Sequence, residues 1–240
     1  MIYKLLQNST FRFVILMSAY EHPTLPFGAK IETDGVWCQI LNRSPNRHPS
    51  PVLFLDRDGV IVEEAQYLSQ VEDVSLIDGA PQIIGLANER GIPVIVVTNQ
   101  SGIARGKFKW QDFINVQEQI LADLDDQNVF VNAVFACPFH ADGHFPYKHP
   151  DHPCRKPNSG MIEKTNQYIS VDKKNSWIIG DRAADLKAGK NSSLTGGIHV
   201  STGHGDKEEQ DQSRLLADAN FQVFLTTSIA NASDHLNILK

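Results

Sequence analysis

The sequence predicts an α/β protein with a doubly wound, Rossmann-like sheet that is mostly parallel. Short apolar runs rich in β-branched residues recur along the chain, and their lack of polar alternation is typical of strands buried on both faces. Segments with the helical spacing of apolar residues separate these runs, and strands that alternate with helices in this way form parallel sheets. Several runs end in polar residues, at the edge where open parallel sheets bind ligands.

Length and composition fit one soluble domain with extensions. The 240 residues are enough to bury a large core, and 41% hydrophobic with 21% charged residues is typical of globular proteins. A net charge of -6 argues against nucleic acid as a partner. The 3 cysteines are an odd number, and two lie in a histidine-rich loop, which favours a reducing compartment over a disulfide framework.

Residues 1–50 are expected to form an N-terminal arm, partly irregular, and residues 51–240 the main domain. The apolar run at residues 13–17 is too short to span a bilayer, and no small-residue cleavage site follows it. We therefore expect translation to begin at Met17, and a cytoplasmic protein without a membrane partner.

The expected elements alternate along the chain. The first core strand, residues 52–55, leads into a polar stretch at residues 63–78, which is long enough to form a flap over the strand end. Pro81 suits the first turn of a helix, and Gly91 ends that helix. Further helices are expected at residues 110–124 and 159–169 and from Ala183 onward. The expected strands are residues 36–41, 52–55, 93–98, 131–136, 177–179, 198–200 and 221–225.

Polar side chains gather at the ends of three strands: Asp56 and Asp58, Thr98 and Asn99, and Asp181 with Asp185 one helical turn later. The basic pair Arg155 and Lys156 precedes the last of these strands. Carboxylates, a hydroxyl and a lysine form the set that moves a phosphoryl group, because phosphoryl oxygens need cations and hydrogen-bond donors. Paired carboxylates also suit a hard cation such as Mg²⁺. Taken singly, each residue has the alternative of a turn or a solvated surface charge.

The order of the motifs LDRDG, VVTNQSG, RKP and IIGDRAAD resembles that of the haloacid dehalogenase-like (HAD-like) phosphatases. The continuation SGIARG and the Cys/His loop before RKP are similar to one branch of them, the heptose bisphosphate phosphatases and the related histidinol-phosphate phosphatase domain. The resemblance covers roughly residues 52–200. It implies the HAD-type sheet with no large cap domain, and a monomer.

The resemblance also implies catalytic roles. Asp56 would attack phosphorus to form an aspartyl-phosphate, and Asp58 would act as general acid and then as general base. Lys156 would offset charge on the phosphoryl group. Asp181 would ligate Mg²⁺ together with the Asp56 carboxylate and the Asp58 backbone carbonyl. The implied substrate-binding residues are Glu64, Tyr67, Thr98, Asn99, Gln100, Ser101, Arg155 and Arg182. Asp185 is expected to be a supporting residue rather than a metal ligand.

The loop from Cys137 to Cys154 carries a structural Zn²⁺ in the resembled enzymes. Here Phe139 occupies one ligand position of that family pattern, with His140 after it, and His152 takes the place of a cysteine. Cys137, His140, His152 and Cys154 can still supply a Cys₂His₂ set, since tetrahedral zinc accepts mixed thiolate and imidazole ligands. The alternative is that zinc has been lost and Pro138, Phe139 and Pro153 hold the loop by packing.

The expected function is Mg²⁺-dependent hydrolysis of a small phosphorylated sugar. The resemblance implies removal of the C7 phosphate of D-glycero-D-manno-heptose 1,7-bisphosphate, a precursor of surface lipopolysaccharide. Two alternatives remain: a histidinol-phosphate phosphatase, and a catalytically inactive binding module with the same fold. The intact acidic and basic motif residues favour an enzyme over the binding module.

Overall fold

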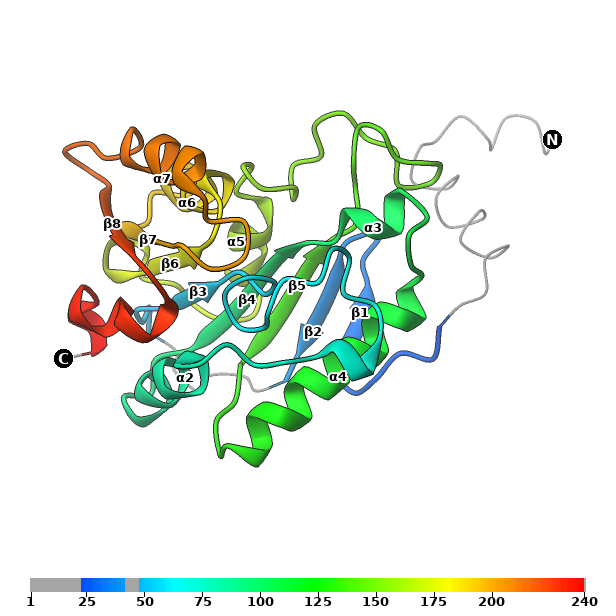
Figure 1. Ribbon diagram of the computed structural model, residues 1–240, viewed down its shortest axis with the longest axis horizontal. Coiled ribbons are helices and arrows are strands. Elements are labelled where there is room, and N and C mark those ends of the chain that lie inside the picture. Colours follow the sequence, from blue (N-terminus) through cyan, green and yellow to red (C-terminus); the bar gives the residue numbers. More distant parts are fainter. Residues whose placement is uncertain (1–22, 42–47, 240) are drawn as a thin grey trace.

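Residues 23–41 and 48–239 are described by the computed structural model, so the expected translation start at Met17 lies outside the described residues. The described residues form one eight-stranded sheet in the order β1-β2-β5-β4-β3-β6-β7-β8 (Figure 1). The strands are β1 (Ala29–Ile31), β2 (Trp37–Ile40), β3 (Leu53–Leu55), β4 (Val94–Asn99), β5 (Ala133–Cys137), β6 (Trp177–Gly180), β7 (Gly196–Val200) and β8 (Gln222–Thr226).

The sheet is mostly parallel, as predicted. Strands β3 to β8 pair in parallel, and β1 and β2 add to one edge in antiparallel fashion. All residues of β3, β5, β6 and β7 are buried, which explains their unbroken apolar sequences. Each predicted strand lies within two residues of an observed one at both ends.

The N-terminal segment contributes more to the sheet than its irregular composition indicates. The strand expected at residues 36–41 is β2, and it pairs with β5, with Trp37 opposite Ala136. The Trp37 ring stacks on Trp110 at 5.7 Å and meets Phe113 edge-on at 5.3 Å. This aromatic packing fastens the segment to the rest of the core, since large buried rings contribute much of a core's apolar area.

Helices cover both faces of the sheet. Figure 1 shows α2 and α4 on one side and α5, α6 and α7 on the other. This division follows from right-handed crossovers that leave the central strand in opposite directions. Within the described ranges no helix is long and apolar enough to cross a membrane. The helices are α2 (Ala80–Glu89), α3 (Ser101–Ala104), α4 (Trp110–Asp126), α5 (Gly160–Thr165), α6 (Ala183–Asn191) and α7 (Lys207–Arg214).

Three helices depart from the prediction. The helix expected at residues 159–169 is α5, which ends at Thr165. α3 spans four residues, too few to show a period, and α7 has the wholly polar sequence KEEQDQSR, so neither has an apolar face to detect. The polar stretch after β3 contains only the 3₁₀ turn η2 (Val71–Asp73), so no large cap domain interrupts the described residues.

The order in which successive parallel strands are added to the sheet reverses beside β3. It proceeds from β3 to β4 and β5 on one side, and from β6 to β7 and β8 on the other. β3 and β6 are therefore neighbours, with Leu55 opposite Ile179, and the residues after these two strands meet at one point. Ligands of open α/β sheets bind at such a switch point, beyond the carboxyl ends of the strands.

Candidate active site

Four ionisable side chains meet at the switch point, and we call them the floor of the site: Asp56, Lys156, Asp181 and Asp185. Asp56 follows β3, Asp181 follows β6, and Asp185 lies in the first turn of α6. None of the four is more than 8% exposed. They line the bottom of a cavity of about 360 Å³ whose walls also contain the flap after β3 and the loop after β5.

Lys156 joins two of the floor carboxylates. Its Nζ lies 2.9 Å from Asp56 Oδ1 and 2.7 Å from Asp185 Oδ1, and it also donates to the Val97 carbonyl at 2.7 Å. Burial acts to lower the pKa of this amine, but Asp185 and Asp56 outweigh burial and the net shift is upward. The ammonium is therefore charged and fully bonded. Asp185, expected as a supporting residue, directly holds the lysine in place.

The floor has more acid than base. Burial raises the pKa of Asp56 to about 6 against the attraction of Lys156, and burial with repulsion from Asp185 and Asp56 raises the pKa of Asp181 to about 8. Both pKa shifts come first from burial and then from repulsion among carboxylates that one lysine does not balance. The carboxylate oxygens of Asp56, Asp181 and Asp185 lie within 4.8 Å of one another, close enough to share a cation.

The free lone pairs indicate which oxygens are available to a metal. Both Asp185 oxygens are engaged, Oδ1 by Lys156 and Oδ2 by the Arg182 N–H at 3.0 Å. Among the residues that the structure describes, Asp56 Oδ2 and Asp181 Oδ1 accept no hydrogen bond. Bare carboxylate oxygens in an acidic, buried setting are the donors that Mg²⁺ prefers. The residues present therefore fit a magnesium ion.

Asp181 is held by close backbone contacts. Its Oδ2 accepts a 2.7 Å hydrogen bond from the His204 N–H. Gly59, which adopts φ +80°, lies against the same oxygen, and a Cβ added there would come within 2.4 Å of it. The glycine of the Asp-x-Asp-Gly motif is thus required both by its left-handed backbone and by the space that Asp181 occupies.

Two side chains, Arg57 and Gln100, hold the Asp58 carboxylate by hydrogen bonds. The buried Arg57 donates to both of its carboxylate oxygens at 2.8–3.0 Å, and Gln100 Nε2 donates to Oδ2 at 2.8 Å. Arg57 was not predicted from the sequence as a site residue. An arginine between two aspartates at the end of a buried strand is the signal that could have identified it, because such an arginine needs a charged partner.

The residues after β4 divide into two groups. Thr98 and Gln100 are bonded to each other at 2.9 Å and, like Ser101, line the cavity. Asn99 also lines it, but its amide accepts from the Lys156 N–H and donates to the Lys156 carbonyl, both at 3.0 Å. The Asn99 side-chain amide therefore fixes the backbone of Lys156, and the expectation that Asn99 binds phosphoryl oxygens stays a prediction.

A second set of side chains surrounds the cavity mouth, and we call it the rim: Glu64, Tyr67, Arg105 and His140. Arg105 Nη1 donates to the Tyr67 hydroxyl at 3.2 Å, and Glu64 lies 3.5 Å from His204. Tyr67 is 37% exposed and has φ +74°, a strained backbone that is common at ligand-contacting loops. Of the predicted substrate-binding residues, Arg155 and Arg182 line the cavity as well. Arg105 lies in the SGIARG stretch that supports the family resemblance, but no residue of that stretch after Ser101 was predicted to contact substrate.

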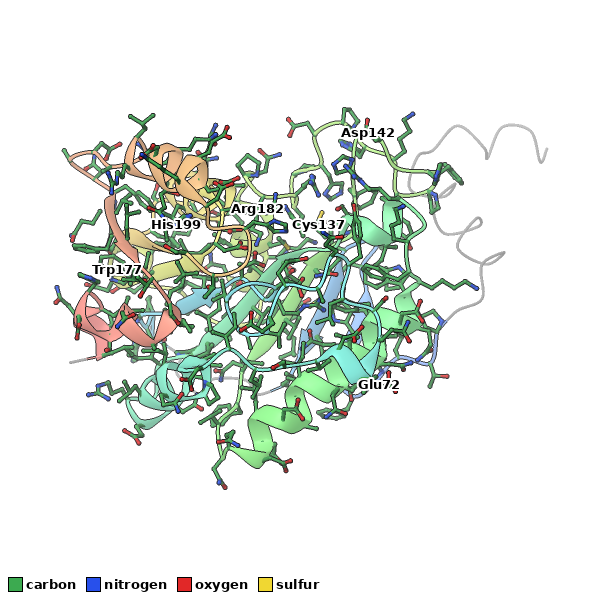
Figure 2. The ribbon with its side chains drawn as sticks, viewed as in Figure 1. Glu72, Cys137, Asp142, Trp177, Arg182 and His199 are labelled. Carbon is green, nitrogen blue, oxygen red and sulfur yellow. The ribbon has the colours of Figure 1, made fainter. Side chains whose placement is uncertain are left out.

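The four candidate zinc ligands are not brought together. Among the described residues, no three of Cys137, His140, His152 and Cys154 have ligand atoms within 4.8 Å of one another. His152 stacks flat on Phe139, with ring centroids 4.0 Å apart, and His140 turns into the cavity toward Arg105. Figure 2 shows Asp142, near His140 in the chain, at the outer turn of this loop, away from Cys137. The structure thus supports the packing alternative, since phenylalanine occupies a ligand position and recruits His152 by stacking.

Comparisons with known proteins agree with this geometry. A family model described as HAD-hydrolase-like matches residues 153–223. The chain is 43% identical over 163 residues to a D-glycero-beta-D-manno-heptose-1,7-bisphosphate 7-phosphatase of Mesorhizobium japonicum, covering 68% of this chain and 75% of that protein. It is 34% identical over 153 residues to the Escherichia coli K12 enzyme of the same name, covering 64% and 80%.

Two solved structures are also similar. A crystal structure described as a HAD-like phosphatase of Mesorhizobium loti matches with a TM-score of 0.73 and 36% identity, covering 91% of this chain and 96% of that one. The D,D-heptose 1,7-bisphosphate phosphatase of B. bronchiseptica, complexed with magnesium and phosphate, matches with a TM-score of 0.66 and 25% identity over 78% and 98%. From its fold, its acidic switch-point site and these relatives, the chain belongs to the HAD-like phosphatases.

Proposed function

We propose that this phosphatase removes the C7 phosphate of D-glycero-D-manno-heptose 1,7-bisphosphate in a Mg²⁺-dependent reaction through an aspartyl-phosphate. The main support for this mechanism is the geometry of the floor, where Lys156 holds Asp56 beside Asp181 at the switch point. The names of the relatives support the substrate. Asp56 and Asp181, with the Asp58 backbone carbonyl, would hold the ion, which supplies positive charge to the phosphoryl oxygens.

In the first step, an Asp56 carboxylate oxygen bonds to phosphorus while the bond between phosphorus and the sugar oxygen breaks. Asp58 gives its proton to the departing sugar oxygen, which would otherwise leave as a strongly basic alkoxide. In the second step, Asp58 takes a proton from water, and the water oxygen attacks phosphorus to release phosphate and restore Asp56. Lys156 and the Thr98 hydroxyl stabilise charge on the phosphoryl oxygens.

Arg57 and Gln100 keep Asp58 directed into the cavity for both proton transfers. Asp185 fixes Lys156, so that the lysine faces the nucleophile in one orientation. Glu64, Tyr67, Arg155 and Arg182 are proposed to contact the sugar beyond the scissile phosphate. We further propose a cytoplasmic monomer that supplies surface polysaccharide synthesis; three free, buried cysteines are in keeping with a reducing compartment.

The test is phosphate release by pure protein with Mg²⁺, from both anomers of the heptose 1,7-bisphosphate, from histidinol phosphate and from 4-nitrophenyl phosphate. We expect the highest kcat/KM on one anomer of the bisphosphate, and heptose 1-phosphate as the product. Asp211→Asn, at an exposed position on α7, serves as the matched control for aspartate substitutions in the floor. Faster turnover of histidinol phosphate would replace the proposed substrate, whereas no turnover of any ester with Mg²⁺ present would favour the binding-module alternative.

A further inference from the structure

The charge in the cavity is divided between its two ends. The floor carries an excess of carboxylates, whereas the rest of the cavity lining includes three arginines and a histidine: Arg105, Arg155, Arg182 and His140. Glu64, the acidic member of the rim, is directed to His204 at 3.5 Å. Asp142 is the acidic partner of Arg105, but at 3.8 Å, and its side chain is 82% exposed, so solvent screens it strongly. The mouth is therefore left with uncompensated positive charge.

The guanidinium groups lie near one another as well as near the cavity. Burial lowers the pKa of Arg155, and the charges of Arg105 and Arg182 lower it further. Arg155 uses Nη1 to donate to the Phe139 carbonyl at 3.0 Å, which fixes its direction. Figure 2 places Arg182 at the start of α6, so these arginines come to the cavity from separate segments of the fold. Gathering like charges without an acid between them costs free energy that a bound anion would recover.

Within the part of the chain that the structure describes, one N–H donor of Arg105 has no acceptor. Its Nη groups contact the Tyr67 hydroxyl and the His140 ring, at 3.2 and 2.8 Å. Its Nε is buried and, among the described residues, has no hydrogen-bond partner. A buried N–H without a partner is costly and uncommon in folded proteins. No side chain of residues 23–41 or 48–239 therefore supplies an acceptor at this position.

Both ring nitrogens of His140 face N–H donors, which is more than one neutral imidazole can accept. Its Nδ1 faces the Asp142 N–H at 3.0 Å, and its Nε2 faces Arg105 Nη2 at 2.8 Å. A neutral imidazole offers one lone pair, and arginine can only donate, so one of the two contacts sets a donor against a donor. An anionic oxygen beside the pair would accept from both Arg105 and His140 Nε2 and remove this conflict.

We propose that Arg105 and His140 form a second anion subsite, which binds the phosphate that is retained when the other is hydrolysed on the floor. The inference rests on the proposed function in one respect, that the substrate carries a second phosphate. The ligand class is a phosphate monoester dianion on a sugar, with the two phosphates at opposite ends. Tyr67 orients Arg105 through its hydroxyl, so the flap takes part in recognition. The subsite makes the enzyme select bisphosphates over monophosphates of the same sugar.

The experiment compares kcat/KM for heptose 1,7-bisphosphate with that for heptose 7-phosphate, which lacks the phosphate assigned to the subsite. The bisphosphate preference is the ratio of these two kcat/KM values. Because hydrogen bonds to a charged group contribute substantially to binding free energy, Arg105→Ala should lower this ratio roughly 10- to 100-fold, mainly through KM. His140→Ala should lower it less, and Arg105→Lys should fall between wild type and Arg105→Ala, because a lysine retains charge but not the fork. Arg90→Ala, at the exposed end of α2, is the matched control.

The possible results distinguish an error in the proposed subsite from an error in the proposed substrate. Equal losses on both heptose phosphates in Arg105→Ala would overturn the subsite and assign the arginine to catalysis or folding. If another bisphosphorylated sugar is the better wild-type substrate, the same comparison is made on it and its matching monophosphate, and loss of preference there supports the subsite although the proposed heptose is wrong. A wild-type enzyme that gains nothing from a second phosphate on any sugar would overturn the subsite.

Discussion

The floor and the rim of the cavity are built in different ways. The three floor carboxylates follow strands or lie in the first turn of a helix, and Lys156 reaches two of them from the loop before α5 at 2.7–2.9 Å. None of the four floor residues is more than 8% exposed. The rim residues lie on connections between elements, and Tyr67 and the Arg105 side chain are 37% and 34% exposed. Chemistry common to a family needs fixed geometry, whereas the choice of leaving group can vary with loops. Changes in the floor should therefore affect every substrate, and changes in the rim only some.

Asp58→Asn should produce the largest contrast between substrates. General acid catalysis contributes roughly 10²- to 10⁴-fold when the leaving group is a poor one, and we expect a loss of that order on the sugar phosphate. An aryl phosphate has a better leaving group and should lose less. Steady-state kcat on both substrates measures this, with Asp211→Asn as the control. Equal losses on the two substrates would contradict the acid role of Asp58.

Lys156→Met should lower stability as well as activity. The substitution leaves Asp56 and Asp185 buried without their cation, and removing one partner of a buried pair typically costs about 3–5 kcal/mol. Urea unfolding of the metal-free protein gives the free energy of unfolding directly. Lys164→Met is a comparison at another ion-paired lysine, which is less buried, and should cost less. Exposed ion pairs contribute up to about 1 kcal/mol. A loss of unfolding free energy below that value in Lys156→Met would show that Asp56 and Asp185 do not depend on the lysine.

Magnesium should stabilise the protein more at pH 8 than at pH 5.5. The folded pKa of Asp181 is raised from 3.8 to about 8, so the metal-free folded state binds protons that the unfolded state releases, and its stability falls as the pH rises through this window. At low pH, protons compete with the metal for the floor carboxylates.

At a Mg²⁺ concentration 100 times Kd the gain is about 2.7 kcal/mol, or roughly 5–10 °C in Tm for a protein of this size. Thermal unfolding with Mg²⁺ or with EDTA, at each pH, measures the effect. Asp181→Asn should remove most of it. An equal Mg²⁺ shift at both pH values, or an undiminished one in Asp181→Asn, would place the metal elsewhere.

The smallest effect is expected at the loop from Cys137 to Cys154. Because Phe139 and His152 hold each other by stacking, the loop should need no zinc. Protein purified without a histidine tag from zinc-supplemented cells should contain far less than one zinc per chain by elemental analysis, and a zinc chelator should leave Tm unchanged. One zinc per chain that is lost in Cys154→Ser would reverse this conclusion.

The sequence predicted the floor well because strand ends have a simple pattern. An unbroken apolar run places its last residue at the sheet edge, so Asp56 and Asp181 were expected to meet, and β3 and β6 are neighbours. Lys156 was recognised as a basic residue before β6, and the family resemblance gave it a role, since no periodicity reveals one. The link from Asp185 to Lys156 was not foreseen, since it depends on where the loop before α5 returns.

The rim was less predictable for physical reasons. Arg105 and His140 are far apart in the chain, and their contact depends on the path of two irregular loops. Asn99 lines the cavity as expected, yet its amide is bonded to the backbone of Lys156, and a sequence motif does not distinguish these uses. The short, polar helix α7 escaped detection because it has no apolar face.

Trapping the phosphorylated nucleophile tests directly whether Asp56 forms the covalent intermediate. The enzyme is mixed with substrate and Mg²⁺, quenched in acid during turnover, and reduced with borohydride, which converts an aspartyl-phosphate to homoserine. We expect homoserine at position 56 by tandem mass spectrometry, in wild type and in Asp58→Asn, and none in Asp56→Asn. Homoserine at another aspartate, or Asp56→Asn with near wild-type turnover, would contradict the assignment of Asp56 as the nucleophile.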